Sequence, residues 1–152
     1  MNIDFPRLPI LRFLMFCCFV LVQAVFPTVV SADEISEHID GIYVEDATIT
    51  PAKKGGTAIL RFKVTNFGQK HVTLVGLSAT FAGTGSMMMN IPEIGPKSVS
   101  ELTILSEETL DFSASHLKGE LGEIVSDLVS GTNVEFVLTF SNFTTTAIAH
   151  VH

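Results

Sequence analysis

The chain has 152 residues, with 16 acidic and 9 basic side chains and a formal net charge of −7 at neutral pH. This length allows one domain at most beside a leader segment. The acidic excess argues against nucleic acid and against an anionic membrane surface as partners, because both attract basic proteins.

The N-terminal residues 1–32 predict a cleavable secretory signal peptide. Arg7 and Arg12 precede an apolar run over residues 13–22, and Val30-Ser31-Ala32 forms a small-residue cleavage pattern. We therefore expect cleavage after Ala32.

An uncleaved membrane anchor is the alternative. Gln23 and Pro27 interrupt the apolar run well short of the roughly 20 residues that a membrane span needs. We therefore expect a periplasmic or secreted protein, formed by residues 33–152, with no stable membrane insertion after the signal is removed.

Both cysteines, Cys17 and Cys18, lie within the predicted leader. The mature chain would then contain 7 basic and 15 acidic residues and no thiol. A site for a soft metal ion in this chain has to use methionine and histidine in place of thiolate.

Strands dominate the first half of the mature chain. After an acidic segment over residues 33–40, residues 42–50 are rich in β-branched side chains and end at a proline. Residues 57–66 alternate apolar and polar side chains, which predicts a strand with one buried face. A turn over residues 66–70 leads to a strand at 71–81, with Val72, Leu74, Gly76 and Ser78 expected on one face.

A glycine-flanked stretch then carries three consecutive methionines, and we expect a loop over residues 83–90 that displays Met87, Met88 and Met89. A thioether is a soft ligand suited to Cu(I). Methionine more often fills gaps in a core, however, so core packing or an apolar loop tip is the alternative.

The second half of the chain continues the strand pattern. Two prolines over residues 91–96 exclude a central strand there, and residues 97–105 alternate again, with Val99, Leu102 and Ile104 expected inward. Residues 106–115 form a loop or one helical turn, and residues 116–121 lead to a short segment at 123–129. Further strands are expected at two places, 133–140 and 144–151. This spacing predicts an all-β fold, an antiparallel β-sandwich or Greek-key barrel.

The order of these elements resembles the periplasmic copper chaperone family of the PCuAC type. The matching stretches are Val44-Glu45-Asp46-Ala47, Thr65-Asn66-Phe67-Gly68, Leu74-Val75-Gly76-Leu77-Ser78, Leu110 followed by His116-Leu117, and Gly131 to Phe140. The resemblance implies a cupredoxin-like sandwich that binds Cu(I) through methionine and histidine. It also implies delivery of copper to a recipient such as a cytochrome oxidase subunit.

Two departures from the family pattern affect the implied site. Family members carry a histidine before the methionines, which this chain lacks, and a methionine two residues after the later histidine, where this chain has Lys118. The ligands that remain are one or more of Met87, Met88 and Met89, together with His116. A surface or capping histidine is the alternative interpretation of His116.

Two histidines near the C-terminal end of the sequence are a second possible metal site. His150 and His152 are expected on the same face of a terminal strand, at a spacing that can hold a metal, although a solvated chain end is the simpler interpretation. No nucleophile elbow, phosphate-binding glycine loop or His-Glu-x-x-His motif occurs, which favours a nonenzymatic role.

Two hypotheses follow. The first is an exported Cu(I) chaperone, and the second is a metal-free accessory module that uses the methionine stretch as an apolar contact with a protein partner. The sequence leaves the oligomeric state open.

Overall fold

The computed structural model describes residues 41–152. The predicted signal peptide, both cysteines and the acidic segment at 33–40 lie outside these residues. No helix within the described range has the length and apolar character that crossing a membrane requires.

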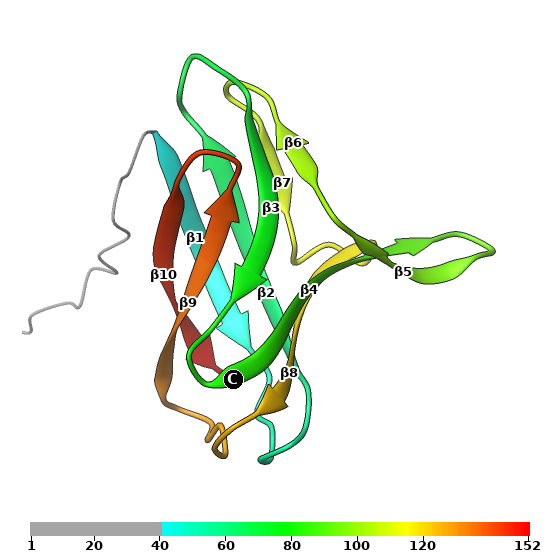
Figure 1. The fold of residues 1–152 in the computed structure, drawn as a ribbon, viewed down its shortest axis with the longest axis vertical. Coiled ribbons are helices and arrows are strands. Elements are labelled where there is room, and N and C mark those ends of the chain that lie inside the picture. Colours follow the sequence, from blue (N-terminus) through cyan, green and yellow to red (C-terminus); the bar gives the residue numbers. More distant parts are fainter. Residues whose placement is uncertain (1–40) are drawn as a thin grey trace, which may run out of the picture. The chain divides into compact units, whose positions relative to one another are not determined.

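Ten strands account for most of the described chain (Figure 1). They are β1 (Ile42–Ile49), β2 (Ala58–Asn66), β3 (Val72–Ser78), β4 (Ala82–Ile91), β5 (Gly95–Val99), β6 (Leu102–Ile104), β7 (Thr109–Asp111), β8 (Leu117–Ile124), β9 (Asn133–Phe140) and β10 (Thr144–Val151). The prediction of an all-β fold is confirmed.

The strands follow the order β5-β4-β8-β2-β1-β10-β9-β3-β6 along one continuous hydrogen-bonded path, and β7 also pairs with β2. Neighbouring strands are antiparallel except β1 and β10, which run parallel. The path folds over, so that β2 and β9 face each other across the core, where the rings of Phe62 and Phe136 lie 5.5 Å apart. The result is a β-sandwich whose non-sequential neighbours require crossovers between the two layers.

The core is formed by the alternating faces that the sequence predicts on β2 and β9. Ala58, Leu60, Phe62 and Val64 on β2 are completely buried. On β9, Phe136, Leu138 and Phe140 are buried in the same way. This burial is the main stabilising contribution, because apolar area removed from water contributes about 25 cal/mol per Å².

The prediction that Leu74, Gly76 and Ser78 share one face of β3 is wrong. Leu74 and Leu77 are both buried, whereas Ser78 is exposed. The pairing of β3 with β9 shifts register between Leu74 and Gly76. A β-bulge at this point inserts one residue and moves the following side chains to the other face.

The predicted strand at 97–105 is two strands, β5 and β6, which pair with different partners. Pro96 lies within β5, and β5 is at the end of the strand order, where a missing N–H costs no sheet hydrogen bond. The undecided segment at 106–115 contains the short strand β7, and residues 117–124 form strand β8.

Candidate metal centre

The three methionines lie in a strand, so the prediction that they occupy a loop is wrong. They belong to β4, which pairs with β5 on one side and with β8 on the other. The glycines that suggested a loop have a packing role here. A Cβ on Gly85 would lie 2.0 Å from the carbonyl oxygen of Leu77, so only glycine allows β3 to cross β4 this closely.

The alternation of β4 separates the methionines onto two faces. Met87 is 2% exposed and belongs to the core, opposite Val99 of β5 and Gly119 of β8. Met89 is partly buried and packs against the same core. Met88, which lies between them, points to the outer face of the β4–β8 pair and is partly buried there.

His116 lies at the end of a short loop that joins β7 to β8. Phe112, at the start of the loop, is buried and stacks on Phe62 with ring centroids 4.2 Å apart. Leu117, at its end, is 2% exposed. Because both ends are fixed in the core, the loop holds His116 at the surface, where it is exposed.

A hydrogen-bond network shapes the same loop. The backbone N–H of Ser113 donates to Asp111 Oδ1 over 2.7 Å, and the Ser113 hydroxyl donates to the same oxygen. These two bonds lower the pKa of the Asp111 carboxyl, the side-chain bond contributing most. Arg61 also donates to the carbonyl oxygen of Ser113 over 3.1 Å. No motif in the sequence marks these three residues.

The register of β4 and β8 places His116 beside Met88. Met88 pairs with Lys118, and the Asn90 N–H donates to the His116 carbonyl over 2.7 Å, which puts His116 opposite Asn90. Residues two apart on neighbouring strands share a face, about 7–8 Å apart along the diagonal, within reach of long side chains. Met88 and His116 are such a diagonal pair, whereas Met87 and Met89 face the other way.

The residue directly opposite Met88 is a cation. The ammonium of Lys118 lies 2.7 Å from Glu120 Oε1, and both side chains are partly exposed. An ammonium has no lone pair and cannot ligate a metal ion. The outer face therefore offers one thioether and one imidazole, with the lysine charge balanced by its neighbouring carboxylate.

Harder donors do not gather elsewhere. Among residues 41–152, no group of three or more His, Cys, Asp or Glu side chains converges on one point. One thioether and one imidazole suit a soft monovalent ion better than a hard divalent one.

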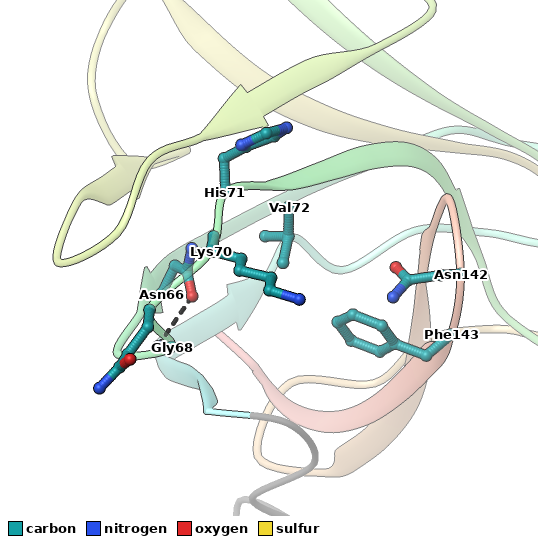
Figure 2. A pocket seen from close by; sticks show the side chains of 8 residues that line it. Asn66, Gly68, Lys70, His71, Val72, Asn142 and Phe143 are labelled. Atoms are coloured by element: carbon teal, nitrogen blue, oxygen red, sulfur yellow. Dashed lines mark hydrogen bonds between the residues drawn. The ribbon is translucent and has the colours of Figure 1, made fainter.

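An open depression of about 460 Å³ lies between the β2–β3 turn and the β9–β10 turn, and none of the four predicted ligands lines it (Figure 2). The Asn66 amide at its edge donates to the carbonyls of Lys70, Ile104 and Leu105 and accepts from the Gly68 N–H. These bonds satisfy the Asn66 side chain and tie the β2–β3 turn to the end of β6. Asn66 therefore has a structural role.

Comparison with known proteins supports the fold. No family profile matches the chain, and no curated protein matches it in sequence. The copper-bound PCuAC domain from PmoF2 superposes with a TM-score of 0.66 at 16% identity, covering 77% of this chain and 97% of that domain. The apo PCuAC domain from PmoF1 gives a TM-score of 0.65 at 13% identity, covering 77% and 98%.

A third similar structure is the solution structure of Cu(I)-DR1885 from Deinococcus radiodurans. It gives a TM-score of 0.56 at 23% identity, and the match covers 71% of this chain and 77% of that one. The chain therefore has the β-sandwich fold of PCuAC domains, as the resemblance in sequence implied.

Proposed function

We propose that this protein is an exported carrier of Cu(I), which it binds between the thioether of Met88 and the imidazole of His116. The observation that supports this most is the register of β4 and β8, which puts partly buried Met88 and exposed His116 on the same outer face. The fold is shared with a copper-bound PCuAC domain and with Cu(I)-DR1885, which makes copper the first ion to test.

The donor chemistry suits Cu(I). Thioether and imidazole are neutral donors, and soft sulfur selects the monovalent ion over the divalent ions that prefer oxygen. Both donors lie on long or exposed side chains, so the ion can pass to another protein by ligand exchange. Copper is cargo in this account, and the role is nonenzymatic.

The partner and location follow from the same proposal. The recipient would be another exported protein with soft ligands, such as a cytochrome oxidase subunit. A periplasmic or secreted location agrees with the predicted signal peptide over residues 1–32 and with a donor set that contains no oxidisable thiol.

A Cu(I) competition assay tests the proposal. Protein beginning at Asp33 is titrated into a coloured Cu(I)–chelator complex under reducing conditions. We expect the wild-type protein to withdraw copper, and Met88→Leu and His116→Ala each to lose this ability. Met87→Leu is the matched control, because it keeps an apolar side chain in the core, and it should compete like wild type. Equal competition by wild type and Met88→Leu would remove Met88 from the site.

A metal-free contact module is the alternative, and one observation favours it. Ile94, in the turn of the β4–β5 hairpin, is 72% exposed. This hairpin extends beyond the other strands (Figure 1). A wild-type protein that fails to withdraw Cu(I) from the chelator would favour this function over the copper carrier.

A further inference from the structure

The end of β10 presents two histidines on the outer face of the sandwich. The burial of β10 alternates, with Ala149 and Val151 buried and His150 and His152 exposed. Both imidazoles therefore point to the same side of the sheet, with ring centroids 6.5 Å apart.

This end of the strand is held by hydrogen bonds on both sides. The Val151 N–H donates to the Thr132 carbonyl over 2.8 Å, and the His152 N–H donates to the Ile49 carbonyl over 3.0 Å. His150 also pairs with Thr48 of β1 and with Asn133 of β9. The backbone at this end of β10 is therefore held in the sheet, while both histidine side chains are exposed to solvent.

The His150 ring is oriented by its cross-strand neighbour. Its Nδ1 lies 2.9 Å from Oδ1 of Asn133. An amide oxygen only accepts, so Nδ1 donates its proton and Nε2 of the neutral ring keeps its lone pair. Histidine ligands in metal sites are commonly fixed in this way, by a hydrogen bond from the ring nitrogen that does not bind the metal.

The second ring completes a pair of donors. The planes of the His150 and His152 rings are nearly perpendicular, at 86°. A shared ion has to lie roughly 2.0–2.1 Å from one nitrogen of each ring. Binding therefore requires the exposed His152 side chain to rotate toward the His150 ring.

We propose that His150 and His152 form a surface site for a divalent late transition ion, with Asn133 as the positioning residue. Two imidazoles without a sulfur ligand suit Cu(II), Ni(II) and Zn(II), and the general order of affinities places Cu(II) first. Solvent completes the coordination sphere, because the site is exposed. Glu135 of β9, which pairs with Ile148 of β10, adds negative charge near the two histidines. This site uses none of the residues of the proposed Cu(I) site.

The test is a Cu(II) titration of untagged protein beginning at Asp33, followed by electron paramagnetic resonance and by competition with a weak chelator. We expect wild type to bind one Cu(II) with nitrogen hyperfine coupling, and His150→Ala/His152→Ala to lose that signal. Asn133→Ala should bind about tenfold more weakly, because the ring loses its fixed orientation. His71→Ala, which removes another exposed histidine, is the matched control and should bind like wild type.

The result that overturns the proposal is a Cu(II) signal and affinity that stay unchanged in the double variant. A Cu(I) competition assay on the double variant distinguishes this histidine site from the proposed Cu(I) site. The competition should equal that of wild type, because Met88 and His116 are intact. All four altered positions are exposed, and thermal melting checks that each variant is folded.

Discussion

Three adjacent residues with the same side chain have different surroundings in this protein. Met87 is in the core, Met89 packs against the same core, and Met88 is partly buried on the outer face. Their side chains are chemically identical, so the sequence cannot say which one faces His116. The pairing of β4 with β8 decides it, and that pairing joins segments about thirty residues apart in the chain.

Because Met87 and Met88 lie on opposite faces of β4, truncating each of them should lower the free energy of unfolding by a different amount. Met87→Ala should lower the free energy of unfolding by about 2–5 kcal/mol, because it leaves a cavity in the core. Met88→Ala should cost about 1 kcal/mol or less, because its side chain is on the outer face. Urea unfolding of both variants measures the difference. Equal losses would contradict the assignment of the two faces.

Replacing Lys118, the residue opposite Met88, should strengthen Cu(I) binding. Lys118→Met removes a positive charge and places a second thioether beside Met88 and His116. We expect Cu(I) binding to become at least about tenfold tighter, or roughly 1.4 kcal/mol. Lys118→Leu removes the charge without adding sulfur and is the matched control. Affinities that are the same for the two variants would show that the added thioether does not reach the ion.

At the scale of elements, the loop between β7 and β8 determines where His116 lies. Buried Phe112 and Leu117 fix its ends, and the Asp111 carboxylate holds Ser113 within it. The carboxylate accepts both bonds in its charged form, which makes the loop sensitive to acid.

The lowered pKa of Asp111 determines how the stability of the fold changes with pH. A carboxyl whose pKa falls on folding stabilises the fold above its ordinary pKa, and this contribution is lost as pH decreases through the lowered value. Asp111→Asn should therefore be less stable than wild type at neutral pH, and the two should converge below about pH 4. Urea unfolding across this range provides the measurement. A stability difference that is independent of pH would exclude the charge as the cause.

The elements that could be predicted are those with a clear period of two. Apolar residues recur at every second position in β2 and in β9, and most of them are buried, although Val134 at the start of β9 is only partly buried. β4 could not be predicted, because its glycines, serine and methionines follow no such period, and its strand conformation depends on pairing with β5 and β8. The bulge in β3 has no signal in the sequence either, since it arises from the register with β9.

At the scale of the whole molecule, the all-β sandwich could be expected from strands at short intervals, but the order of those strands could not. The segment at 97–105 looks continuous in sequence, yet β5 pairs with β4 and β6 pairs with β3. As a result, the β4–β5 hairpin extends beyond the other strands of the sandwich (Figure 1). The proposed Cu(I) site lies at the start of that hairpin, beside the end of the β7–β8 loop.

X-ray absorption at the copper edge, on protein beginning at Asp33 and loaded with one Cu(I), tests the central claim most directly. We expect both sulfur and nitrogen neighbours of copper in wild type and in Met87→Leu, and loss of the sulfur neighbour in Met88→Leu. A wild-type spectrum without sulfur, or a sulfur neighbour that persists in Met88→Leu, would contradict it.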